Sequence, residues 1–429
     1  MVSLCFVGRA ECQSRTNPQT WPALFGGAEA RGVREGGLAL SVLLFGGYDD
    51  AVLADQASDT SNRPSADGFS TGLGVRLLYA RPGNRGAFRA WANSGMRYYP
   101  GFGDLTSTYH SIGLSLSASL NRRLSIYANP RADYSPRYSL RLLPPPLPVD
   151  PEPGSAVSDA TEASAPDIDY SVIRHEIFRY GGSVGADISV SDRSSVALDY
   201  GYSKRDSDVA LTDLEVQNAG LSFSYRFTRN ASLGLGYSFQ EGTSRSGGLT
   251  ITTQAQSIDM GVNYMKPLTR TRRTYLRFHT GSIVIDSVGG RRLNAIGSAS
   301  LVHQMGRTWT GQVQYRRELR YVDGFDRPIF ADTVSTAVGG LLKQRLEFAA
   351  NASYFTGTVG VNPNSPPFDS YSAFARLRRA LTRTLAAYVE YYFYHYNFDE
   401  GTVRPAGLPP RFDRNGVRVG LMLWIPLID

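Results

Sequence analysis

Residues 227–240, FTRNASLGLGYSFQ, have the pattern of a turn followed by a strand with two different faces. One face holds Leu233, Leu235, Tyr237 and Phe239, and the other holds Ser232, Gly234, Gly236 and Ser238. A strand in a soluble sandwich turns its apolar face to a packed core and long charged side chains to water. The apolar face fits that pattern, but the very small residues of the other face need a different explanation.

The same unit recurs along the chain, for example as LNRRLSIYANP from Leu120, VSDRSSVALDYGYS from Val190 and LTRTLAAYVEYYF from Leu381. Successive turns lie about 37 to 40 residues apart, except for one interval of about 70 that contains a long insertion. The returning strands alternate in the same way, as in SIGLSLSASL from Ser111. Counting the strands that follow the turns together with the returning strands predicts roughly eighteen strands of about 10 to 14 residues each.

Composition narrows the classes of protein. No apolar run in these 429 residues approaches the roughly 18 that a membrane-spanning helix needs, whereas a transmembrane barrel dilutes its apolar face with a polar one. Cys5 and Cys12 both lie in the first segment, so no disulfide framework organises the body of the chain. The net charge of +7 comes from scattered arginines, which argues against a nucleic-acid partner.

Long connections alternate with the short turns. Residues 135–169 are rich in Pro, Ala, Ser and acids and are not expected to form a strand. Other long connections are predicted near 48–66, 241–252, 357–370 and 397–413. An even strand count, short turns at one end and long loops at the other predict an all-β, antiparallel, up-and-down transmembrane barrel of about 18 strands, with 16 as the alternative. A propeller blade would need four short strands per repeat, so strand length favours the barrel.

The chain resembles a Gram-negative outer-membrane β-barrel of the porin-like size class over nearly its whole length. The segment NGVRVGLMLWIPLID is similar to the closing strand of such barrels, with its apolar face supplied by Val417, Val419, Leu421, Leu423, Ile425 and Leu427. Trp424 is the nearest aromatic residue to the end, where the family usually has a terminal aromatic. The resemblance implies an outer-membrane location, periplasmic short turns and extracellular long loops. It also implies contact with outer-membrane lipid, lipopolysaccharide and the barrel-assembly machinery.

Residues 1–35 precede the predicted barrel, which spans 36–429. A secretory signal needs a basic start and an apolar run, but Arg9 and Glu11 interrupt the first segment before such a run forms. Two interpretations stay open: a degenerate or wrongly assigned signal region, or a disordered periplasmic arm.

In a barrel the small residues make sense, because the non-lipid face lines a lumen in which Ser and Gly leave room for water and for charges. Strand-by-strand assignment turns eleven arginines inward: Arg76, Arg89, Arg97, Arg131, Arg226, Arg277, Arg316, Arg320, Arg376, Arg378 and Arg418. Seven acids share that face: Asp133, Asp187, Asp199, Asp259, Glu318, Glu347 and Glu390. The prediction is a water-filled, mildly cationic lumen. The alternative is that these charges neutralise one another across strands, for instance Glu390 between Arg376 or Arg378 and Arg418.

Aromatic residues crowd the segment YVEYYFYHYNF, residues 388–398. Tyr388, Tyr392, Tyr394 and Tyr396 share the inward face and could form a sugar-stacking ladder, although aromatic girdles at the membrane interfaces are the commoner use.

Signals for enzyme chemistry are poor. Gly181-Gly182-Ser183-Val184-Gly185 matches the spacing of a nucleophile elbow but lies inside an alternating strand. The five histidines show no metal-ligand spacing, and no cofactor motif is present. A surface hydrolase using His175 and His395 is the remaining enzyme alternative.

The sequence therefore predicts a channel for small hydrophilic solutes with mild anion selectivity. The alternatives are the outer-membrane component of an export system, such as one for exopolysaccharide with periplasmic export partners, or a structural or adhesive barrel.

Overall fold

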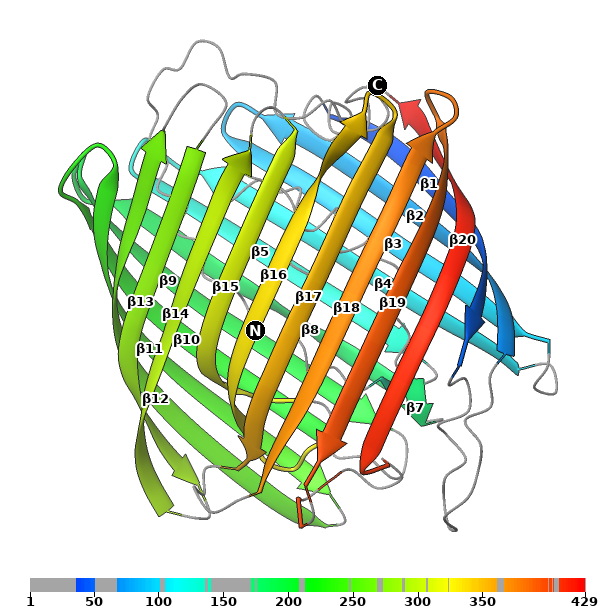
Figure 1. The fold of residues 1–429 in the computed structure, drawn as a ribbon. Helices are drawn as coiled ribbons and strands as arrows, with labels where there is room; N and C mark the ends of the chain where they lie inside the picture. The colour runs from blue at the N-terminus through cyan, green and yellow to red at the C-terminus, as the bar shows by residue number, and fades with distance from the viewer. Residues whose placement is uncertain are drawn as a thin grey trace.

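The computed structural model is a closed barrel of eighteen tilted strands (Figure 1). It describes residues 36–50, 68–100, 105–135, 138–139, 171–173, 176–207, 213–246, 248–267, 273–287, 290–305, 308–322, 324–360, 366–399, 401–402, 404 and 409–428. The barrel strands are β1 (Gly37–Asp49), β2 (Gly68–Gly83), β3 (Gly86–Tyr99), β4 (Leu105–Ser119), β5 (Leu124–Ser135), β8 (Ile177–Ser189), β9 (Ser194–Ser207), β10 (Asp213–Arg226), β11 (Ala231–Ser246), β12 (Leu249–Pro267), β13 (Arg273–Ser287), β14 (Gly290–Met305), β15 (Trp309–Arg320), β16 (Ile329–Lys343), β17 (Leu346–Val359), β18 (Pro367–Ala380), β19 (Leu385–Phe398) and β20 (Arg411–Ile428).

Every barrel strand pairs antiparallel with its sequence neighbour, and β1 also pairs with β20 along nearly its whole length, which closes the ring. The predicted all-β barrel and its count of eighteen strands are confirmed. The strands are 12 to 19 residues long, somewhat longer than predicted. None of the described residues forms a helix long and apolar enough to cross a membrane.

The short turns that repeat in the sequence gather at one end of the barrel, at the top of Figure 1. A polar side chain stabilises several of them. In the turn between β4 and β5, Asn121 Oδ1 accepts hydrogen bonds from the backbone N–H groups of Arg123 (2.7 Å) and Leu124 (2.8 Å). Ser191 and Thr382 accept the equivalent pair of bonds in their turns. The recurring polar residue therefore forms an Asx turn or a Ser/Thr turn, in which its side chain stabilises the reversal of the backbone.

One predicted long loop is wrong. Residues 241–252 are not a loop, because β11 continues to Ser246 and β12 begins at Leu249. Gly248, with a φ of +82°, lies in the tight turn between them. The segment is rich in Ser, Thr and Gly, which suggested a loop, but Thr is a good strand former, and Thr243 and Thr252 pair their hydroxyls across the hairpin at 3.3 Å.

The prediction for residues 135–169 is tested only at its margin. Residues 138–139 form β6 (Tyr138–Ser139), which pairs with β7 (Ser171–Ile173) in a small separate sheet, so this edge of the segment does form a strand, contrary to the prediction. Proline is concentrated further along, which leaves these two residues free to pair. The rest of that segment, and the two interpretations of residues 1–35, lie outside the described residues.

The outer surface of the barrel is apolar and exposed, as lipid contact requires. Large side chains such as Leu235, Phe278 and Val419 are 49–59% exposed on successive parts of the wall. Aromatic residues mark both margins of this surface: Tyr48, Phe69, Phe178, Tyr180, Tyr202, Tyr354 and Tyr371 towards the long loops, and Tyr79, Phe88, Phe227, Trp309 and Phe348 towards the short turns. Two aromatic girdles flanking an apolar band are typical of transmembrane barrels.

The small inward residues have a specific role in packing. A Cβ atom added to Gly236 would lie 2.4 Å from Asp259 Oδ1 on β12, and one added to Gly72 would lie 2.2 Å from the Phe45 ring on β1. These glycines therefore lie beneath side chains of neighbouring strands and let them lie flat against the inner wall. The small face identified in the sequence provides space for charged and aromatic side chains from adjacent strands.

Replacing Gly416 by alanine should lower the free energy of unfolding by about 1 to 3 kcal/mol, because the new Cβ would lie 2.1 Å from Cζ of the buried Tyr392 ring. Gly46→Ala is the matched control: its Cβ meets nothing within 4 Å, and its effect should stay within about 0.5 kcal/mol. Urea unfolding of the refolded barrels measures both. If the two variants lose the same free energy of unfolding, the Tyr392 ring moves aside for the new methyl group without cost.

Candidate functional site in the barrel lumen

The loop between β15 and β16 turns into the lumen at the long-loop end. β15 pairs with β14 only from Trp309 to Arg317, although β14 extends beyond that point to Gly290. Beyond Arg317, β15 keeps only β16 as a pairing partner. Leu319 accordingly packs in a buried cluster with inward residues of β12 and β13, including Ile285. The end of β15 therefore leads the loop, of which residues 321–322 and 324–328 are described, away from the wall.

Polar contacts hold one side of the inserted loop. The Tyr321 hydroxyl donates a hydrogen bond to the Thr253 carbonyl of β12 at 3.1 Å, and Ser244 Oγ of β11 donates to the Asp326 carbonyl at 2.5 Å. Burial raises the pKa of the Tyr321 hydroxyl, so this group remains a neutral donor. Gly242 makes room for the ring, since a Cβ there would lie 2.0 Å from it.

Apolar contacts hold the other side. Phe325 is 3% exposed, and its ring centroid lies 6.3 Å from that of Phe368 and 6.1 Å from that of Phe398. The same buried cluster includes Val322 from the loop and Ile177 from β8, which lies halfway around the ring from β17. The inserted loop thus joins opposite walls and narrows the lumen at this end.

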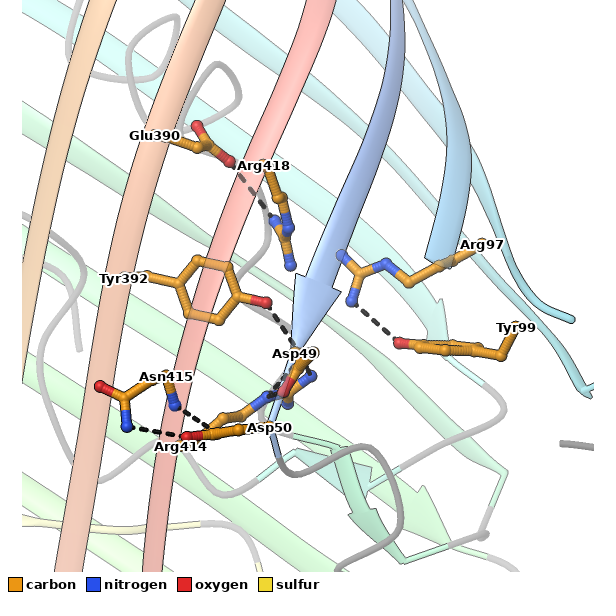
Figure 2. A network of polar contacts seen from close by, with 9 residues as sticks. All are labelled: Asp49, Asp50, Arg97, Tyr99, Glu390, Tyr392, Arg414, Asn415 and Arg418. Carbon is orange, nitrogen blue, oxygen red and sulfur yellow. Dashed lines mark hydrogen bonds and ion pairs between the residues drawn. The ribbon is translucent and has the colours of Figure 1, made fainter. Parts of the chain in front are cut away.

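Next to this constriction, inward side chains of β1, β3, β19 and β20 form a buried polar network (Figure 2). Arg414 Nε donates to both carboxylate oxygens of Asp49, at 2.9 and 2.8 Å, and the Tyr392 hydroxyl donates to Asp49 at 2.9 Å. Asp49 and Arg414 are each 2% exposed. This charge-assisted contact crosses the seam at which the first and last strands meet.

Further along the same strands, towards the short turns, arginines and aromatic rings stack on one another. The Arg418 guanidinium lies 4.6 Å from the Tyr392 ring centroid and 5.3 Å from that of Phe45, and Arg97 lies 5.4 Å from Phe45. Glu390 is paired in register with Arg418, which it approaches to 3.7 Å. Neither carboxylate oxygen of Glu390 has a hydrogen-bond partner among the described residues. The stacking holds the two guanidinium groups in place beside Glu390.

The wall from β17 to β3 carries more positive than negative charge. Its described inward residues include Arg76, Arg89, Arg97, Arg376, Arg378, Arg414 and Arg418, against Asp49, Glu347 and Glu390. Arg378 contacts Glu347 at 2.7 Å and Arg376 contacts it at 3.9 Å. Part of the charge is thus paired across strands, as the alternative interpretation expected, and the remainder is positive.

The structure brings some of the other predicted charges together in smaller groups. Arg316 and Arg320 flank Glu318 on β15, at 3.6 and 3.7 Å. Arg131, Arg226 and Arg277 lie on β5, β10 and β13, and Asp133, Asp187, Asp199 and Asp259 lie on β5, β8, β9 and β12. Asp187 and Asp199 are near neighbours on the paired strands β8 and β9.

The four candidate tyrosines face inward but are buried. Tyr394 and Tyr396 are 0% exposed in the cluster around Phe412, Tyr392 is covered by Arg418, and Tyr388 lies against Gly420. In this arrangement none of the four presents an open ring face to a sugar.

Sequence reasoning missed Asp49, Arg414, Phe45 and the inserted loop. Asp49 and Arg414 lie at strand ends beside long loops, where the alternation of polar and apolar residues is less regular. The spacing of Arg414 and Arg418 on one strand face was the available signal.

Nothing among the described residues supports a catalytic or metal centre. No group of three or more His, Cys, Asp or Glu side chains there could hold a metal ion. Ser183 lies within β8, in the ladder with β5 and β9. His395 contacts Asp413 at 2.5 Å on the outer face, and His175 lies outside the described residues.

A closed antiparallel barrel with an apolar outer band, two aromatic girdles and a charged lumen defines a transmembrane β-barrel of the bacterial outer-membrane type. No protein-family model and no curated protein matches the chain. Among solved structures it is similar to Pseudomonas aeruginosa OpdQ (10% identity, 93% of this chain and 100% of that one, TM-score 0.45). It is also similar to P. aeruginosa OccK2 (OpdF) in complex with glucuronate (12%, 92% and 99%, 0.45) and to Acinetobacter baumannii OccAB4 (12%, 91% and 98%, 0.42). At these identities the similarity concerns the fold alone.

Proposed function

We propose that the protein is an outer-membrane channel through which small hydrophilic solutes diffuse, with anionic solutes favoured. The observation that supports this proposal is the excess of arginine over carboxylate on the wall from β17 to β3, which extends from Arg97, Arg414 and Arg418 near the constriction towards the short turns. Fixed cations on the wall of a narrow lumen attract anions and repel cations. The guanidinium groups also present paired donors that suit carboxylate and phosphate groups.

Reversal potentials of the refolded protein in a planar bilayer, under a salt gradient, test this proposal. We expect an anion preference, and we expect the double variant Arg76→Gln/Arg97→Gln to lower the anion-to-cation permeability ratio roughly two- to fivefold. Arg317→Gln is the matched control, since Arg317 contacts Asp332 at 3.2 Å on the outer face and should leave the ratio unchanged. Cation preference of the unmodified protein, or a folded barrel without conductance, would contradict the proposal and favour an export component or an adhesive barrel.

A further inference from the structure

The outer wall contains a large apolar groove that the proposed channel does not use. Its volume is about 1010 Å³, and it crosses β2 to β10 near the short turns. Leu116, Ile126, Val184, Leu198 and Tyr200 line it, all of them more than a third exposed on the outer face. The groove therefore opens to the membrane and not to the lumen.

The floor of the groove is made of alanines. Ala128 lies in register between Leu116 and Val184, and Ala186 lies between Ile126 and Leu198. Each small side chain leaves a depression between two large ones on the same face. Because large and small residues alternate over four neighbouring strands, the depressions join into a continuous groove that fits flexible apolar chains.

The rim of the groove at the short-turn end is basic. Arg81 lines the groove itself. The four adjacent turns, residues 82–85, 120–123, 190–193 and 227–230, carry Arg85, Arg122, Arg123, Arg193 and Arg229 against the single acid Asp192. All of these turn residues are exposed. A cluster of guanidinium groups at the edge of the apolar band lies at the depth of lipid phosphates.

A second copy of the chain fits this surface poorly. Copies in one membrane share an orientation, so a lateral neighbour would place its own short turns at the same depth. Several of those turns are basic too, with Lys343, Arg345 and Arg383. Like charges would then face one another, whereas an anionic lipid would neutralise the rim.

We propose that this groove binds a phospholipid with an anionic headgroup, whose acyl chains fill the apolar floor and whose phosphate contacts the arginines of the neighbouring turns. The site belongs to the outer face, so it is independent of the proposed solute pathway. Binding there would anchor the short-turn end of the barrel to one leaflet.

Native mass spectrometry of the purified barrel with added phosphatidylglycerol or phosphatidylcholine tests the inference. We expect the unmodified protein to retain at least about fivefold more phosphatidylglycerol than phosphatidylcholine. Ala186→Phe fills the groove and should abolish the preference, whereas Ala375→Phe, on the outer face of β18, should keep it. Because a groove variant could fold poorly, the double variant Arg122→Ser/Arg123→Ser is a second test on exposed turn residues, and it should reduce the preference for phosphatidylglycerol. Arg383→Ser, in a turn away from the groove, is its control and should keep the preference.

Equal retention of both lipids by the unmodified protein would overturn the inference, as would undiminished retention by Ala186→Phe. Multimers that Ala186→Phe dissociates would instead identify the groove as an interface between copies. Channel conductance of Ala186→Phe should remain normal in every case, so a failure of this inference is distinguishable from a failure of the proposed channel.

Discussion

Replacing Asp49 by asparagine should lower the free energy of unfolding by about 3 to 5 kcal/mol, because the substitution leaves the Arg414 guanidinium buried without its carboxylate. The position makes the effect large. Asp49 ends β1 and Arg414 lies near the start of β20, so their contact bridges the two strands that no turn connects. Urea unfolding of the barrel refolded into lipid vesicles, followed by tryptophan fluorescence, measures the change.

Two comparisons separate this contact from a general effect of removing charge. Asp413→Asn removes a carboxylate that is 47% exposed on the outer face of β20, and it should cost less than about 1 kcal/mol. The double variant Asp49→Leu/Arg414→Met replaces the ion pair by apolar groups and should recover most of the lost stability. If Asp49→Asn unfolds at the same urea concentration as the unmodified protein, the seam does not depend on this pair.

Neighbouring contacts support the same seam. Asp50 accepts hydrogen bonds from the backbone N–H of Asn415 (2.6 Å) and from its side-chain amide (2.9 Å). Figure 2 shows these contacts beside the Asp49–Arg414 pair. In a barrel the first and last strands are joined only by such pairing, so polar contacts at their loop ends protect the seam from fraying.

Replacing Phe325 by serine should raise single-channel conductance roughly two- to fivefold, since the ring is the apolar contact between the inserted loop and the Phe368 and Phe398 rings. Without it the loop loses its attachment on that side of the lumen and the narrow region widens. Conductance of the refolded protein in a planar bilayer measures the effect.

Phe69→Ser is the control for this variant, because Phe69 is 69% exposed on the outer face and does not contact the loop. Its conductance should match that of the unmodified protein. Heat-modified migration in SDS gels establishes that both variants are folded. A folded Phe325→Ser barrel with unchanged conductance would show that the loop does not limit the solute path.

Much of the candidate site could be predicted from alternation alone. Because strand side chains point to opposite faces with a period of two, Arg376, Glu390 and Arg418 were assigned to one face, and the register places Glu390 directly opposite both arginines. The period does not say how far a side chain reaches or what covers it. Burial of Tyr394 and Tyr396 beneath the aromatic cluster could not be predicted, since it depends on β20 and on the inserted loop.

The barrel could be predicted from the sequence, because each segment carries its own polar turn and alternating strands, and the even count follows from adding the segments together. The place where the lumen narrows depends on tertiary contacts, because residues 321–322 and 324–328 enter the lumen through contacts with β11, β12 and the wall opposite. The pairing of Asp49 with Arg414, two residues at opposite ends of the chain, depends on such contacts too. Such contacts form only when the ring closes, and their partners leave no periodic signal in the sequence.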